Sequence, residues 1–137
     1  MAKLAKFKTS NRELLGLYKG LEAVKSIKGA RFAVLVGKNI KELKNILDPL
    51  EQAAVPGVEF QELSVQMQKL IEEENQSEIE KLEANNSELI DQRKQQLADV
   101  ETLLDNEIEV QLHPIREDQL PDDITGEQVE KLLQLIT

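Results

Sequence analysis

One stretch of the chain alternates strictly between apolar and polar residues, and it constrains the fold more than any other. From Glu107 to His113, the apolar Ile108, Val110 and Leu112 alternate with polar residues. This two-residue period predicts a β-strand with one face toward a core and the other toward water. Nearly all of the remaining sequence has helical patterns, and a lone strand would leave its backbone donors and acceptors unpaired. The strand therefore needs a partner, and that partner decides the architecture.

The basic start of the chain is the partner that we expect for this strand. Residues 3–8 interleave lysines with Leu4 and Phe7, and these lysines can face Glu107 and Glu109. Opposite charges on facing strands contribute about 0.2–1 kcal/mol per pair. The alternative is an N-terminus that frays and pairs with nothing.

A capping box predicts where the first helix begins. The Ser10 hydroxyl can accept a hydrogen bond from the N–H of Glu13, and the Glu13 carboxylate can accept one from the N–H of Ser10. The helix should end at Gly29, because glycine favours the position after a last helical turn. Its inward face, at three-to-four spacing, consists of Leu14, Leu17, Tyr18, Leu21, Val24 and Ile27. We expect Tyr18 to be a half-buried core residue whose hydroxyl is exposed to water, rather than a catalytic group.

The next segment allows two interpretations. Arg31 to Gly37, taken alone, has the apolar run of a buried strand. The run continues at helical spacing through Ile40, Leu43, Ile46, Leu47 and Leu50. We therefore predict a helix over residues 30–54, which Pro49 kinks or divides. The Gly37-Lys38 pair lacks the glycine-rich run and the Lys-Ser/Thr pair of a phosphate-binding loop.

A strong turn signal over residues 55–58 precedes a third helix. Its inward residues are Phe60, Leu63, Met67, Leu70 and Ile71. Between residues 72 and 87 apolar residues become sparse. This region is either the exposed end of one long helix or a break that returns the chain as a hairpin near Asn75 to Asn86. We favour the break, because Asn and Ser leave helices readily.

A fourth helix over residues 87–105 and a short last helix complete the pattern. The inward residues of the fourth helix are Leu89, Ile90, Leu97, Val100, Leu103 and Leu104. Asp123 or Thr125 can cap the last helix. From it we expect four residues to dock onto the body: Val129, Leu132, Leu133 and Ile136.

These elements predict a mainly α fold. We expect an antiparallel helical bundle or coiled-coil hairpin, closed by a minimal two-stranded β-sheet of residues 3–8 with residues 107–113, and a short C-terminal helix. The 137 residues are predicted to form a single domain, with residues 58–105 able to project as a helical hairpin arm.

The residue types present limit the chemistry. The chain has no cysteine and one histidine, His113, so the sequence offers neither a thiol nucleophile nor a histidine metal cluster. We expect His113 to be exposed rather than a catalytic base. The acids near Asp118 and Asp122 lack the spacing of a calcium loop, which favours a solvated bend over a cation site. We therefore predict a protein that is not an enzyme, with no metal and no cofactor.

The charges are divided unevenly along the chain. Residues 1–50 hold 11 Lys/Arg and 4 Asp/Glu, whereas residues 51–137 hold 6 Lys/Arg and 22 Asp/Glu. Either the basic half packs against the acidic half and neutralises part of it, or an acidic face is offered to a basic partner. The acids that we single out as a candidate interaction surface are Glu72, Glu73, Glu74, Glu78, Glu83, Glu117, Asp118, Asp122, Asp123 and Glu127.

The order of these elements resembles that of a family of small, mostly helical proteins encoded by tailed bacteriophages. The resemblance rests on a Leu-rich helix ending in Lys-Gly (Glu13 to Gly29), a helix over Phe32 to Ala54, a charged helical hairpin, the strand Glu107 to His113, and the tail from Leu120 to Leu132. It implies a phage origin, and with it the host cytoplasm or the virion as the location. The family supplies no functional residues to transfer.

Three functions are open at this point. The first is a non-enzymatic protein–protein interaction protein that binds a host or phage protein, in its sharpest form an inhibitor of a host defence or nucleic-acid-handling protein that uses an acidic helical face. The second is a virion structural or assembly component that forms homo-oligomers through its helices or its edge strand. The third is nucleic-acid binding through the basic N-terminal half, against which the overall acidity and the low aromatic content stand. No apolar run approaches the roughly 18 residues of a membrane span, so we expect no membrane partner.

Overall fold

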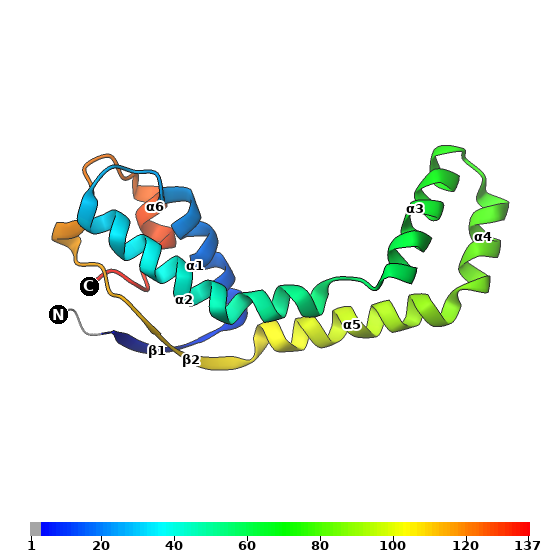
Figure 1. The fold of residues 1–137 in the computed structure, drawn as a ribbon, viewed down its shortest axis with the longest axis horizontal. Helices are drawn as coiled ribbons and strands as arrows, with labels where there is room; N and C mark the ends of the chain where they lie inside the picture. The colour runs from blue at the N-terminus through cyan, green and yellow to red at the C-terminus, as the bar shows by residue number, and fades with distance from the viewer. Residues whose placement is uncertain (1–3) are drawn as a thin grey trace. The chain divides into compact units, whose positions relative to one another are not determined.

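The computed structural model describes residues 4–137, and within that range the chain is mainly α-helical (Figure 1). The elements, in order, are β1 (Ala5–Ser10), α1 (Asn11–Val24), α2 (Ala30–Ala54), α3 (Val58–Glu72), α4 (Gln76–Asn85), α5 (Ser87–Asp105), β2 (Glu107–Leu112), the 3-10 turn η1 (Glu117–Gln119) and α6 (Gly126–Lys131). The predicted fold class, helices with a two-stranded antiparallel sheet and a short C-terminal helix, is confirmed. The predicted first strand began at Lys3, which lies outside the described residues.

The chain divides into two compact units. The terminal unit joins the chain up to Pro49 to the segment from Leu103 onward, and the middle unit is Leu50–Thr102. One boundary falls inside α2 and the other inside α5. The sequence predicted one domain with an arm over residues 58–105, and the middle unit contains most of that segment.

The sheet of the terminal unit pairs the N-terminal strand with the strand that follows α5, as the sequence predicted. Strands β1 and β2 run antiparallel, with Lys8 opposite Glu109. The predicted pairing of Glu107 with a lysine is wrong, because the register places Ser10 opposite Glu107. The apolar residues of β2 are buried or half-buried and its polar residues are exposed, so the alternation sets the faces of the strand.

The terminal unit contains nearly all of the buried apolar side chains. Among residues 4–137, 13 of the 14 buried apolar residues belong to it. They are Leu14, Leu17, Leu21, Val24, Phe32, Val36, Leu43, Leu47, Val110, Leu112, Ile115, Leu132 and Leu135. Helices α1 and α2 each contribute one apolar stripe to this core, and the second strand and the C-terminal segment contribute the rest.

Two caps define helix starts in the terminal unit. Ser10 Oγ accepts from the N–H of Glu13 at 3.2 Å, as predicted. The reciprocal half of that box is wrong: the Glu13 carboxylate accepts from the hydroxyl of Thr9 at 2.6 Å, and Ser10 is itself the last residue of β1. Thr125 caps α6 in a complete box with Gln128, with hydrogen bonds of 3.1 and 3.0 Å.

The segment after α6 corrects one prediction about the core. Leu132 is buried, but Leu133 is 59% exposed rather than docked. The reason is that α6 ends at Lys131, so helical spacing no longer decides which residues face inward. Leu135 becomes the buried residue instead, and its carbonyl accepts from the N–H of Ile115 at 2.8 Å.

The prediction for α2 is confirmed over its full length. The apolar run that could have formed a strand is helical, and Pro49 lies inside the helix without ending it. The buried residues of α2 are Phe32, Val36, Asn39, Leu43 and Leu47.

The middle unit contains the predicted break, which occurs in two places. Helix α3 ends at Glu72, α4 spans Gln76–Asn85, and α5 begins at Ser87, so α3 and α4 form a helical hairpin (Figure 1). The hairpin turn carries the paired hydrogen bonds of a Schellman motif, from Glu74 N to Ile71 O at 3.1 Å and from Asn75 N to Leu70 O at 3.0 Å.

The apolar residues of the middle unit are much less covered than those of the terminal unit. Among residues 50–102, all of which the structure describes, Leu63 is the only buried apolar side chain. Ile71 and Leu97, predicted to face inward, are 51% and 44% exposed, and Leu103, just beyond this unit, is exposed as well. Helices α4 and α5 contain no buried residue, so their apolar spacing does not imply a core surface.

Candidate interaction surface

The net charge of the protein is carried by the middle unit. Its sequence holds 13 Asp/Glu and 4 Lys/Arg, a net charge of −9. The terminal unit holds 13 of each, a net charge of zero. The acidic C-terminal segment thus belongs to the same unit as the basic first 49 residues, and the excess negative charge lies on residues 50–102, mostly on α3, α4 and α5.

The ten acids singled out from the sequence divide equally between the two units. Glu72, Glu73, Glu74, Glu78 and Glu83 lie in the middle unit, around the turn between α3 and α4. Glu117, Asp118, Asp122, Asp123 and Glu127 lie in the terminal unit, between β2 and the first turn of α6. All ten are exposed.

Three acids of the terminal-unit set, Asp118, Asp122 and Asp123, lie near basic side chains. Asp118 forms an ion pair with Arg116, with Nε and Oδ1 3.2 Å apart. A surface depression of 500 Å³ is lined by the acidic bend together with Lys28 and Arg31, at the start of α2. Across residues 4–137, no group of three or more His, Cys, Asp or Glu side chains is arranged to hold a metal ion.

Two acids of the middle-unit set line a groove between α3 and α4. This groove has a volume of 380 Å³. Leu70 and Leu82 are its half-buried apolar residues, one from each helix. Exposed polar side chains form the rest of the lining, among them Glu73 and Glu78 from the acidic set. The groove therefore combines an apolar seam with charged edges, on which Lys69 and Lys81 balance the two acids.

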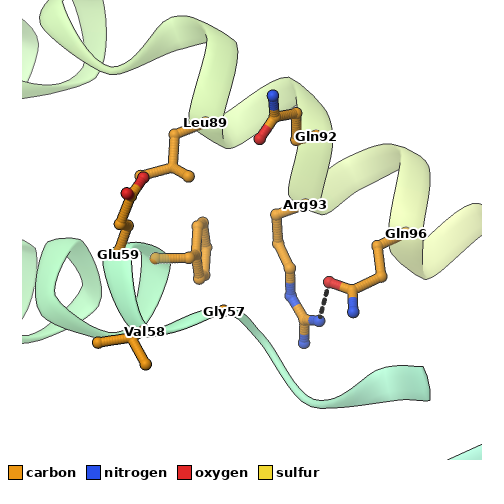
Figure 2. Close-up of a pocket in the computed structure, with 8 residues that line it drawn as sticks. Gly57, Val58, Glu59, Leu89, Gln92, Arg93 and Gln96 are labelled. Carbon is orange, nitrogen blue, oxygen red and sulfur yellow. Dashed lines mark hydrogen bonds between the residues drawn. The ribbon is translucent and has the colours of Figure 1, made fainter. Parts of the chain in front are cut away.

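A second depression, of 480 Å³, lies between the start of α3 and α5 in the same unit (Figure 2). Arg93 and Gln96 extend from α5 and hydrogen bond to each other at 2.8 Å. Arg93 Nη1 donates to the carbonyl of Ala54 at 2.7 Å, and Gln96 Nε2 donates to the carbonyls of Ala53 and Val55 at 2.8 and 2.9 Å. Ala53 and Ala54 are the last residues of α2 and Val55 follows them, and a helix leaves its last carbonyls unpaired and favours a cation at this end. Arg93 and Gln96 thus stabilise the fold at this depression.

Phe60 adds a further contact to Arg93. The guanidinium carbon of Arg93 lies 5.7 Å from the centroid of the Phe60 ring, within the range of a cation–π interaction. Arg93 is therefore held by a carbonyl, an amide and a ring, which makes it a structural residue.

His113 and Tyr18, which the sequence analysis considered as catalytic residues, are both half-buried. His113 is half-buried rather than exposed, and its backbone is bonded by Asn39. Tyr18 is half-buried, as predicted. Partial desolvation and a hydrogen bond to the Glu22 carboxylate raise the pKa of Tyr18 above its ordinary value of 10.0. A hydrogen bond from Lys25, and then one from Tyr18, lower the pKa of Glu22.

Two buried asparagines had no signal in the sequence analysis. Asn39 is fully buried in α2, and the largely buried Asn11 donates from Nδ2 to the carbonyl of Leu103 at 2.9 Å. Their partners are 74 and 92 residues away in the sequence, so only the fold brings them together.

Comparison with known proteins finds no match: no family model, no curated protein and no solved structure matches this chain. The phage family therefore remains a prediction. Within residues 4–137, no helix combines the length and the apolar content that crossing a membrane requires.

Proposed function

We propose that this protein is a non-enzymatic binding protein that engages another protein through the acidic helices of its middle unit. The observation that supports this most is the coincidence of two properties in one unit. Residues 50–102 carry the whole net charge of −9, and Leu63 is their only buried apolar side chain. A helical surface that is both acidic and poorly covered suits a partner that is basic and partly apolar.

The sharpest form of the proposal is inhibition. Exposed carboxylates along helices can compete with phosphates for a basic groove, so a nucleic-acid-handling or defence protein of a bacterial host is the partner class that we propose. The net charge of the middle unit would attract such a partner over a distance comparable to the Debye length, about 10 Å at 0.1 M salt. The phage origin enters this proposal from the sequence resemblance alone.

The neutral charge of the terminal unit weighs against nucleic acid as the direct ligand. Its 13 basic residues are matched by 13 acidic ones. Self-assembly through the middle unit would bring together two surfaces of net charge −9, which repel each other at low salt. Both alternatives remain predictions from the sequence.

Two variants of equal net charge test the proposal. One replaces the five acids of the middle-unit set with glutamine, and the other replaces the five of the terminal-unit set with glutamine or asparagine; each changes the net charge from −9 to −4. Wild type and both variants are immobilised and exposed to bacterial cell extract, and captured proteins are quantified by mass spectrometry. Circular dichroism establishes that all three are folded.

We expect basic proteins to be captured by the wild type and by the terminal-unit variant, and to be lost from the middle-unit variant. Capture should also weaken between about 50 and 300 mM salt, because exposed charges are screened. Equal capture by all three proteins would contradict the proposal, and so would selective loss from the terminal-unit variant.

A further inference from the structure

Within the middle unit, the groove between α3 and α4 is lined only by residues of these two helices and of the turn between them. Bundles usually bury the apolar stripe of each helix between at least two neighbours. Helix α4 has no buried residue, and its apolar side chains Ile79 and Leu82 are only half-buried. On α3, Leu70 is half-buried and Ile71 is 51% exposed. The seam of the hairpin is therefore incomplete.

The surroundings of this seam identify the chemistry that would complete it. Residues 58–86 hold eight Asp/Glu and two Lys, a net charge of −6. Both lysines, Lys69 and Lys81, line the groove, but Lys81 Nζ lies 3.4 Å from Glu78 Oε1 and is paired with it. The charged side chains that line the groove therefore balance, two lysines against Glu73 and Glu78, and the net negative charge lies on the other acids of the hairpin. An occupant that presents apolar residues toward Leu70 and Leu82 and positive charge toward those other acids fits this surface.

We propose that the groove between α3 and α4 binds a basic amphipathic helix of a partner protein, which packs as the third helix of a bundle. This rests on the proposed function and specifies its partner. An amphipathic helix has an apolar stripe at three-to-four spacing, which matches a groove with one leucine from each wall. A second copy of this chain is the less favoured occupant, since its middle unit carries the same net charge of −9.

The probe for this test is a synthetic Leu/Lys peptide of about 18 residues, or five helical turns, with leucines at three-to-four spacing. A scrambled peptide of identical composition has the same charge but no apolar stripe. Binding of both to the full chain is measured by fluorescence anisotropy at low and moderate salt. We expect the amphipathic peptide to bind at least about tenfold more tightly, because only it buries leucines in the groove.

Two matched variants locate the binding. Leu82→Gln removes a groove residue, whereas Val65→Gln alters an apolar residue that is 71% exposed and does not line the groove. We expect about tenfold weaker binding for Leu82→Gln and no change for Val65→Gln. Because Leu82→Gln can also loosen α4, methyl NMR of the wild-type protein supplies an independent measurement, in which the peptide should shift the signals of Leu70 and Leu82.

Specific results would overturn this inference. They are equal affinity for the two peptides, unshifted Leu70 and Leu82 methyls, or self-association of the free protein in sedimentation that the peptide does not reverse. The peptide test can fail in this way while the middle-unit glutamine variant still captures fewer basic proteins than the wild type. The acidic surface then binds a partner that places no helix in the groove. The proposed function then survives and the inference fails.

Discussion

Asn39 pairs with the backbone of His113 through both atoms of its amide. Asn39 Nδ2 donates to the carbonyl of His113 at 2.9 Å, and the N–H of His113 donates to Asn39 Oδ1 at 2.7 Å. His113 directly follows the last residue of β2, so the amide provides both bonds that an adjacent strand would otherwise make. A fully buried side chain of α2 thus ties this helix to the end of the sheet.

Replacing Asn39 with leucine should destabilise the terminal unit. The side chains are similar in size, but leucine leaves a donor and an acceptor of His113 without partners in a partly buried site. We expect a loss of about 2–3 kcal/mol in the free energy of unfolding, measured by urea denaturation. Asn45→Leu, at an exposed position of the same helix, is the control and should change stability little. Equal stability of the two variants would show that the paired amide is not a stabilising contact.

Two glycines of α1 should respond in opposite ways to alanine. Alanine is favoured over glycine in a helix by about 1 kcal/mol, and a Cβ built at Gly16 meets no described atom within 4 Å besides its chain neighbours and the nearby backbone of its own helix. A Cβ at Gly20 would lie 3.0 Å from Lys131 Cβ and 3.4 Å from the carbonyl oxygen of Lys131, where α1 and α6 meet. Thermal unfolding should show Gly16→Ala stabilised and Gly20→Ala at least about 1 kcal/mol less stable than Gly16→Ala. An equal gain in stability for both variants would mean that α6 can move away from the new methyl group at position 20 without a loss of stability.

Tyr18 offers a direct pH measurement, because it is the only tyrosine and the chain has no tryptophan. Its pKa is raised first by desolvation and then by its bond to the Glu22 carboxylate. The folded state therefore holds the phenol proton more tightly than the unfolded state. Protonated Tyr18 therefore favours the folded state. This contribution to the free energy of unfolding is fully present below the pKa that Tyr18 has in the unfolded chain, and it is lost as pH rises through its pKa in the folded protein.

Absorbance of tyrosinate in the ultraviolet should consequently show Tyr18 titrating above pH 10.0 in the native protein. Glu22→Gln should move that titration to lower pH, since it removes the negative charge that disfavours the phenolate. Glu88→Gln, which removes one acid from the middle unit, should leave the titration in place. A titration unaffected by Glu22→Gln would show that desolvation and the charge of Asp48, rather than Glu22, raise the pKa of Tyr18.

The features that the sequence predicted correctly depend on neighbours along the chain. The alternation in β2 and the caps at Ser10 and Thr125 each involve residues that are two or three positions apart. The break between α3 and α4 was predicted from the polar residues of that segment. Such signals set the elements and the fold class.

The contacts between distant segments were not predictable in the same way. Nothing in the composition of α2 distinguishes the buried Asn39 from the exposed Asn45. The sequence did not show where the net charge lies for the same reason, because the count over residues 51–137 grouped the acids of residues 103–137 with those of the middle of the chain. Only the return of that segment to the basic first 49 residues shows that the middle unit carries the excess.

The turn between α3 and α4 provides the last prediction. Glu74 has a φ of 56°, a left-handed conformation that costs a residue with a Cβ roughly 1–2 kcal/mol relative to glycine. It occupies the position after the helix end where glycine is usual. Glu74→Gly should therefore stabilise the hairpin by about 1 kcal/mol, seen as slower hydrogen exchange of α3 and α4 amides near the turn.

Two controls separate backbone conformation from charge at this turn. Glu74→Gln removes the same charge but keeps the strained φ, so it should slow exchange much less than glycine does. Glu73→Gly places glycine one residue earlier, where φ is −81° and a glycine only adds freedom to the unfolded chain, so exchange should become faster. If Glu74→Gln slowed exchange as much as Glu74→Gly, repulsion among the clustered carboxylates would be what limits the hairpin. The same repulsion would then be relieved when a basic partner binds.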